Sequence, residues 1–259
     1  MKLNKIISSF LLCCLAIIFV INGTVGQASA QVERKEDIIF FIDQIAPKAR
    51  KLAWDNDLYA SVMLAQAILA SDYGRSELSN DQVNNIYSMQ GRYQDRYVKW
   101  SDGAIVDEAT NYSEYRKYPS YNEALKDFVA LMKNGTSSDP NFYSGAFRSK
   151  TVNYKEATAF LISRYAEDPE YSKRLNAIID LYNLTDFDVK PDSDKENNFN
   201  KVHKNEALEK LNTKKVHIVT ANQTLVDIAD KYQIDLLSLI ENNHLGTSAI
   251  VVGQELVVD

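Results

Sequence analysis

Residues 65–76 have the sequence A-Q-A-I-L-A-S-D-Y-G-R-S, and they continue an apolar run that begins at Leu58. The apolar side chains recur at the three- and four-residue spacing of a helix, and polar residues are scarce throughout the run. This pattern predicts a buried helix over 58–73. Gly74 is expected to end it, because glycine readily adopts the left-handed conformation that follows many helices.

The flanking sequence predicts a mainly helical domain with one small β-lobe, an α+β fold. Residues 38–46 place apolar side chains at helical spacing, and Pro47 is expected to introduce a kink or a second helix start. Further amphipathic helices are expected over 121–133, 153–165 and 169–182. Residues 92–112 are aromatic and strand-like, with a hairpin turn predicted at 101–103.

The first thirty residues have the pattern of a secretory signal peptide. Lys2 and Lys5 precede a nearly unbroken apolar run over 6–21, and Ala-Ser-Ala at 28–30 is a small-residue cleavage site before Gln31. An uncleaved membrane anchor is the alternative, because the run approaches the roughly 17–25 residues that span a bilayer. We expect cleavage, and therefore a secreted chain with no stable membrane anchor.

Cysteine and charge exclude several classes of function. Cys13 and Cys14 both lie in the leader, so the exported chain has neither disulfides nor thiolate chemistry. The whole chain carries a formal charge of −6, and removal of the leader with its two lysines leaves 27 basic and 35 acidic side chains, a charge of −8. This balance argues against nucleic-acid binding. The few histidines are not spaced as metal ligands, so neither a metal nor another cofactor is expected.

Composition divides the remaining chain into three parts. Residues 31–184 form the helical domain, residues 185–215 are polar and charged, and residues 216–259 regain apolar periodicity in a compact module. The middle segment has too few apolar residues for a core, so a flexible linker is expected. The oligomeric state cannot be predicted from these features.

Four motifs in the helical domain carry a resemblance to a known family. Residues 65–76 resemble A-Q-A-x-x-E-S-G-x-G-x-S, and N-N-I-Y-S-M-Q-G at 84–91 is similar to N-N-L-F-G-I-K-G. Y-R-K-Y-P-S at 115–120 resembles F-R-K-Y-x-S, and R-Y-A-E-D-P-E-Y at 164–171 resembles G-Y-A-T-D-P-x-Y. These are motifs of the family 73 glycoside hydrolases, lysozyme-like glucosaminidases and muramidases of bacterial cell walls. The resemblance covers roughly 37–184 and implies a lysozyme-like fold with peptidoglycan as the ligand.

One residue departs from the family pattern at the point where it matters most. Ala70 stands where the family has the glutamate that protonates the glycosidic oxygen. Glycoside hydrolysis normally needs two carboxyl groups, and loss of a general acid costs about 100- to 10,000-fold in rate. The resemblance therefore implies lost or weak cleavage. An Ala70 introduced by engineering is a further possibility that the sequence leaves open.

The second carboxylate also departs from the pattern. The family's β-lobe glutamate aligns with Lys99 or Ser101, and Asp107 and Glu108 are the candidate replacements. Asp72 and Glu77 lie near Ala70 in sequence, but we expect both to be solvated surface groups. The alternative function is an active hydrolase that cuts the backbone between N-acetylglucosamine and N-acetylmuramic acid with a displaced carboxylate.

The residues expected to bind glycan are better preserved. Aromatic faces suit sugar rings, and the resemblance implies a cleft lined by Gln66, Tyr73, Asn85, Tyr87, Tyr118 and Tyr165. Any of these tyrosines could instead pack the domain, and Gln66 and Asn85 could instead hold the backbone of the cleft.

The C-terminal module resembles a LysM domain, a small βααβ unit that binds peptidoglycan. A-N-Q-T-L at 221–225 stands where that family has S-G-D-T-L, and the closing I-V-V-G-Q-E-L-V-V at 250–258 matches I-x-x-G-Q-x-L-x-V. Asparagine tolerates a positive φ better than most residues, so the turn should survive replacement of the usual glycine. His217 and His244 are expected at surface or cap positions. The resemblance assigns glycan contacts to Asn222, Gln223, Thr224 and Asn242. Together the two resemblances predict a secreted, wall-associated protein of the Gram-positive type.

Overall fold

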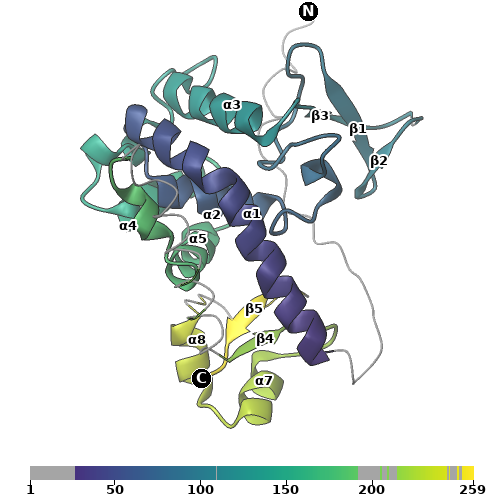
Figure 1. Ribbon diagram of the computed structural model, residues 1–259, viewed down its shortest axis with the longest axis vertical. Coiled ribbons are helices and arrows are strands. Elements are labelled where there is room, and N and C mark those ends of the chain that lie inside the picture. The colour runs from purple at the N-terminus through teal and green to yellow at the C-terminus, as the bar shows by residue number, and fades with distance from the viewer. Residues whose placement is uncertain are drawn as a thin grey trace, which may run out of the picture.

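The computed structural model describes residues 27–108, 110–191, 205, 209, 215–243, 245, 250 and 253–259. The predicted leader before residue 27 and most of the predicted linker lie outside these ranges. Within the described part of the chain, no helix has the length and apolar character needed to cross a bilayer. The described residues form a mainly helical domain with small antiparallel sheets, an α+β fold as predicted (Figure 1).

In the part of the larger domain that the structure describes there are five helices: α1 (Gln27–Asp55), α2 (Ala60–Ala70), α3 (Tyr121–Asn134), α4 (Tyr154–Leu161) and α5 (Tyr171–Leu181). The same described residues also form short 3₁₀ turns: η1 (Glu77–Ser79), η2 (Ser144–Ala146), η3 (Arg148–Lys150) and η4 (Leu184–Asp188). Helix α2 is central, with every residue from Ala60 to Ile68 buried. The prediction of a buried helix is therefore confirmed, because α1, α5 and η4 all pack against it.

Helix α1 continues through Pro47, so the predicted second helix start is wrong. Proline removes one helical hydrogen bond and clashes with the preceding turn. Its neighbours Ile45, Ala46 and Ala49 are all buried in the main core. Burial of this face on both sides of Pro47 offsets the lost bond and keeps the helix in one piece.

Packing of the helical domain extends beyond the predicted boundary at Leu184. Phe187 in η4 is 2% exposed and belongs to the main core. Arg50 of α1 donates to the carbonyl oxygens of Val189 (3.2 Å) and Lys190 (2.8 Å). The amphipathic sequence pattern ends at residue 184, but the chain stays in contact with the helical domain as far as Lys190 through these hydrogen bonds.

Asp188 caps helix α2 from a distant part of the chain. Tyr59, the N-cap residue, makes no side-chain cap, and Asp188 accepts instead from the Ser61 backbone N–H (2.9 Å) and hydroxyl (2.6 Å). We predict that Asp188→Ala lowers the free energy of unfolding by about 1–2 kcal/mol, the usual value of an N-cap. Asp188→Asn, which keeps an acceptor oxygen, should cost much less. Urea unfolding followed by tryptophan fluorescence tests this, and equal losses for both variants would contradict the capping role.

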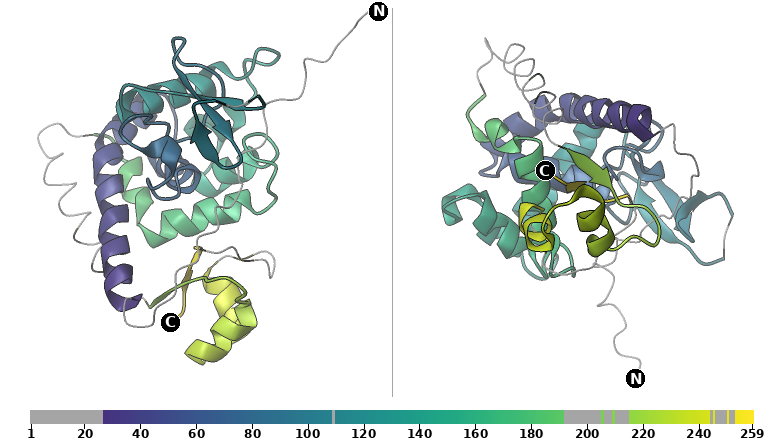
Figure 2. Two further views of the ribbon diagram at one scale, coloured as in Figure 1. Left: turned by 90° about the vertical axis from the view of Figure 1, so that its right-hand side faces the viewer. Right: turned by 90° about the horizontal axis from the view of Figure 1, so that it is seen from below.

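The β-lobe is one antiparallel sheet in the order β2-β1-β3, with β1 (Tyr97–Ser101), β2 (Ala104–Val106) and β3 (Ser113–Arg116). Asp102 and Gly103 form the two-residue turn with φ of 51° and 85°, which confirms the predicted hairpin. One face of the sheet packs in a separate apolar cluster of Leu78, Val83, Val98, Trp100, Ile105 and Tyr115. Figure 2 shows the sheet against the helical part of the domain.

The C-terminal module has the predicted βααβ arrangement. Its elements are β4 (Val216–Ile218), α7 (Leu225–Tyr232), α8 (Leu236–Asn242) and β5 (Glu255–Val257), and β4 and β5 pair antiparallel. Thr224 and Asp227 form a reciprocal capping box at the start of α7. Asn222 has a φ of 64°, so the expectation that asparagine can replace glycine in this turn is confirmed. The Tyr182 hydroxyl of the helical domain donates a hydrogen bond to Glu255 Oε2 of this module (3.2 Å).

His217 is buried, which corrects the expectation of a surface or cap position. It is 5% exposed, and its ring nitrogens bond to Tyr232 Oη (3.0 Å) and Gln223 Oε1 (2.9 Å). Gln223 Oε1 already accepts from Thr220 N, so the His217 Nε2 facing it has to carry a proton. This arrangement joins β4 to α7 through the turn that was predicted to bind glycan.

We predict that acid destabilises the C-terminal module through His217. Burial lowers the pKa of His217, Lys231 lowers it further, and the bond to Gln223 opposes them only in part. Unfolded histidine has a pKa of about 6.5, so below that pH the unfolded chain binds a proton that the folded module resists. Stability of the module should therefore fall as pH drops below about 6.5. Calorimetric scans between neutral and acidic pH test this, and His217→Gln should flatten the dependence.

Candidate active site

Position 70 lies at the C-terminal end of helix α2. The helix ends at Ala70, three residues earlier than predicted, because Asp72, Tyr73 and Gly74 all adopt positive φ (49°, 59° and 81°). The Ser71 hydroxyl accepts from the Gly74 N–H (2.7 Å) and closes this turn. A Cβ on Gly74 would come within 2.6 Å of the Phe41 ring, so no other residue fits there without a shift.

A hydrogen-bonded segment connects this helix end to the β-lobe. The Ser88 hydroxyl donates to the Ala70 carbonyl oxygen (2.9 Å), and the Gly91 N–H donates to the Glu114 carbonyl oxygen in β3 (2.8 Å). Between them, buried Asn85 bonds to both backbone groups of Met89 and to the Arg116 carbonyl oxygen, each at 2.9 Å. Asn85 therefore sets the shape of the segment between α2 and the sheet.

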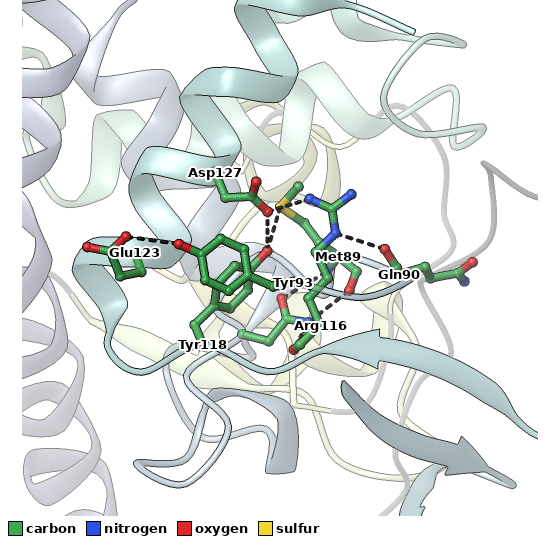
Figure 3. Close-up of polar contacts among 8 residues, drawn as sticks. Met89, Gln90, Tyr93, Arg116, Tyr118, Glu123 and Asp127 are labelled. Carbon is green, nitrogen blue, oxygen red and sulfur yellow. Dashed lines mark hydrogen bonds and ion pairs between the residues drawn. The ribbon is translucent and has the colours of Figure 1, made fainter. Parts of the chain in front are cut away.

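A polar cluster fixes the end of β3 to helix α3 (Figure 3). Asp127 of α3 accepts from both Arg116 and the Tyr118 hydroxyl, and Arg116 Nε also donates to the Gln90 carbonyl oxygen (3.0 Å). Burial and the neighbouring Asp127 raise the pKa of Tyr118, so its hydroxyl remains a donor. This cluster orients the β-lobe on the helical domain.

Four of the six residues predicted to bind glycan in the cleft are buried: Gln66, Asn85, Tyr87 and Tyr118. Tyr87 donates to the Met63 carbonyl oxygen (3.2 Å) and stacks on Phe128, and Gln66 donates to the Tyr171 hydroxyl (3.0 Å). These contacts are internal to the domain. Contact with glycan stays a prediction for all six residues. Because a buried side chain cannot reach a ligand, the geometry favours such contact for the remaining two, Tyr73 and Tyr165.

Tyr73 and Tyr165 are the two partly exposed members of that set. Tyr73 follows directly after α2 and meets the Tyr182 ring edge-on at 6.4 Å between centroids. Tyr165 lies between Phe128 and Tyr171, at 5.9 and 6.0 Å. Arg75 also lies over the Tyr73 ring, 5.2 Å from its centre, and Tyr143 is a third aromatic neighbour of Tyr165 at 6.2 Å. Both residues nevertheless keep part of their surface accessible, which contact with a sugar requires.

The acids near position 70 in sequence have other partners. Asp72 pairs with Arg75 at 3.0 Å, and Glu77 accepts from the Ile105 backbone N–H in β2 (2.9 Å). Asp107 and Glu108, the candidates for a displaced carboxylate, are both exposed after β2. Lys99 donates to the Asp107 carbonyl oxygen (3.0 Å). The role of Asp107 and Glu108 in any chemistry stays a prediction.

Sequence reasoning missed Glu114. This residue is the direct antiparallel partner of Lys99 in the β1–β3 ladder, so the two side chains share a face of the sheet. Arg92 holds the Glu114 carboxylate with two hydrogen bonds, of 2.7 and 2.5 Å. Arg92 lowers the pKa of Glu114. The strand-like alternation of S-E-Y-R at 113–116 was the available signal, but only the register shows which residue it opposes.

The glycan-binding residues predicted in the C-terminal module surround its first turn and its second helix. Asn222 and Thr224 are exposed, and Gln223 is half-buried by its bonds to His217 and Thr220. Asn242 is exposed at the end of α8 and donates to the Asp259 carbonyl oxygen (3.2 Å). Their contact with glycan stays a prediction. Within the described ranges, no group of acidic, histidine or cysteine side chains could hold a metal ion.

Comparison with known families and proteins identifies relatives for both parts of the chain. Residues 46–184 match the Glucosaminidase model, described as mannosyl-glycoprotein endo-beta-N-acetylglucosaminidase, and residues 217–259 match the LysM domain. The exo-glucosaminidase LytG of Bacillus subtilis is 31% identical over 194 residues, which cover 72% of this chain and 68% of LytG. A probable N-acetylmuramidase of Lactococcus lactis is 34% identical over 220 residues, covering 84% of this chain and 50% of that protein.

A solved structure supports the same relationship. The catalytic domain of the autolysin Auto from Listeria monocytogenes is 34% identical, with a TM-score of 0.54 over 65% of this chain and 100% of that domain. This chain spans about half the length of the Lactococcus protein and 30% of an Enterococcus faecalis autolysin.

Proposed function

Because the chain belongs to the glucosaminidase family and carries a LysM domain, we propose that it is an exported cell-wall protein that binds the glycan strands of peptidoglycan. We propose in addition that its cleavage of those strands is lost or weak. The leader-like sequence over 1–30 supports export, and the two domains support a location at the wall.

One observation carries the proposal of lost cleavage. Ala70 occupies the last position of α2, where the family's general acid is expected, and a methyl group has no proton to donate. Asp72 and Glu77, the nearest acids in sequence, are already bonded to Arg75 and to β2. Without protonation of the glycosidic oxygen, the rate of bond cleavage falls by about 100- to 10,000-fold.

Support for glycan binding comes from the preserved surroundings of position 70. The turn after α2, the Asn85-centred segment and the cluster around Asp127 all remain closed by hydrogen bonds. Tyr73 and Tyr165 keep partly exposed rings near this framework. The mature chain is acidic, so its binding to an anionic wall should depend on stacking and hydrogen bonds and change little with salt.

Sedimentation with insoluble peptidoglycan tests the proposal. Residues 31–259 should enter the pellet at low and high salt while releasing few reducing ends from the glycan. A chain that stays in the supernatant would refute wall binding. Rapid release of reducing ends would refute the loss of cleavage and favour the alternative, a hydrolase that cuts between N-acetylglucosamine and N-acetylmuramic acid with a displaced carboxylate.

A further inference from the structure

The register of the β-lobe places both aligned positions of the family's second carboxylate on one face. Side chains alternate along β1, so Tyr97, Lys99 and Ser101 point to the face opposite Val98 and Trp100. Val98 and Trp100 pack in the apolar cluster of the lobe. Lys99 and Ser101 therefore share the other face, and either alignment puts the missing carboxylate there.

Glu114 presents a carboxylate on that same face from the neighbouring strand. It is the direct partner of Lys99, and Cβ atoms of such partners lie about 4.5–5.5 Å apart. Its side chain keeps 27% of its surface exposed, so a ligand can approach it. The ammonium group of Lys99 lies at the β2 side, bonded to the Asp107 carbonyl oxygen and 5.0 Å from the centre of the Tyr112 ring.

We propose that Glu114 is the second carboxylate of this site, displaced by one strand from the family's position. The site then lacks one carboxyl group, at Ala70, and not two. This inference rests on the proposed function, in which the cleft still holds a peptidoglycan strand.

Glycoside hydrolysis needs one carboxyl group that donates a proton and one carboxylate that is ionised, and the surroundings of Glu114 suit the second role. Two hydrogen bonds from Arg92 favour the ionised carboxylate, which cannot protonate a leaving group but can support a cation-like sugar or accept a proton from water. With an acid restored at position 70, that acid gives its proton to the glycosidic oxygen and the bond from the anomeric carbon to that oxygen breaks. Water then adds to the anomeric carbon and its proton passes to Glu114.

The test compares two ways of breaking the Arg92–Glu114 pair in an Ala70→Glu background. Adding Glu114→Gln removes the carboxylate and should lower the release of reducing ends from peptidoglycan about 100-fold or more. Adding Arg92→Gln breaks the same ion pair but keeps the carboxylate, so most activity should remain at neutral pH. The acid limb of its pH–rate profile should move to higher pH, because Arg92 no longer lowers the pKa of Glu114. Equal losses in both variants would show that only the ion pair matters and would overturn the proposal.

A charge exchange tests whether a carboxylate at position 99 can replace the one at position 114. Lys99→Glu combined with Glu114→Lys, again with Ala70→Glu, should retain activity because the face keeps one carboxylate. If Ala70→Glu does not raise the release of reducing ends, the site lacks more than one group and the inference fails. It fails equally if the release rises only when Lys99→Glu is added.

Sedimentation with peptidoglycan is measured in parallel. Loss of binding by the native chain would refute the proposed function, whereas variants that bind peptidoglycan without cleaving it refute only this inference. Thermal unfolding confirms that each variant is folded.

Discussion

Ala70→Glu should raise hydrolysis of peptidoglycan by about 100- to 10,000-fold, the usual contribution of a general acid. The position suits such a group for electrostatic reasons. It is half-buried at the C-terminal end of α2, where the helix carries partial negative charge. Both the burial and the helix end raise the pKa of an introduced carboxyl, which helps it keep its proton near neutral pH. The backbone at position 70 is already held by the Ser88 hydroxyl.

Ala70→Gln is the matched control for this prediction. Its side chain has nearly the same size and also forms hydrogen bonds, but it cannot protonate a leaving oxygen. Reducing-end release should therefore rise with glutamate and stay at the native level with glutamine, while both variants sediment with peptidoglycan. A native chain that already cleaves as fast as the glutamate variant would contradict the assignment of position 70, and another acid would then carry the chemistry.

The fold could be predicted from sequence because its main signals are local. Helical apolar spacing located α2, α3 and α5, and the Asp-Gly turn located the β1–β2 hairpin. Helix ends were less accurate where the backbone turns left-handed at residues other than glycine. Asp72 and Tyr73 shorten α2 in this way, and Ser163, with a φ of 61°, follows the early end of α4 at Leu161. Sequence alone does not distinguish these positions from helical ones.

The candidate site was only partly accessible from sequence. Motif spacing located Ala70, but it did not distinguish aromatic residues that face a cleft from those that fill the core, such as Tyr87 and Tyr118. Glu114 became visible only through the pairing of β3 with β1. Burial of His217 likewise depends on Tyr232 and Gln223 meeting around it, which requires the packed module. Contacts between distant segments decide all of these roles.

Asn85→Ala should lower the free energy of unfolding of the helical domain by about 3 kcal/mol or more. Asn85 is fully buried and bonds to the Met89 N–H, the Met89 carbonyl oxygen and the Arg116 carbonyl oxygen. The Met89 carbonyl oxygen still accepts from the Arg116 N–H (2.9 Å), but alanine removes the Asn85 partner of the Met89 N–H and of the Arg116 carbonyl oxygen. An unsatisfied buried polar group costs about 1–3 kcal/mol, and the two together account for the expected loss. The loss should also free the segment that carries Ser88 from its place beside Ala70.

Tryptophan fluorescence during urea unfolding measures this loss selectively, because the only two tryptophans of the chain, Trp54 and Trp100, lie in the helical domain. Asn111→Ala is the control, since Asn111 is exposed between β2 and β3 and its replacement should change stability by no more than about 0.5 kcal/mol. The resemblance assigned Asn85 to glycan binding, and that role makes a different prediction. A variant with native stability and weakened sedimentation on peptidoglycan would identify Asn85 as a ligand contact. A destabilised variant identifies it as the residue that holds the cleft's backbone in place, and we expect this result because all three of its bonds are internal.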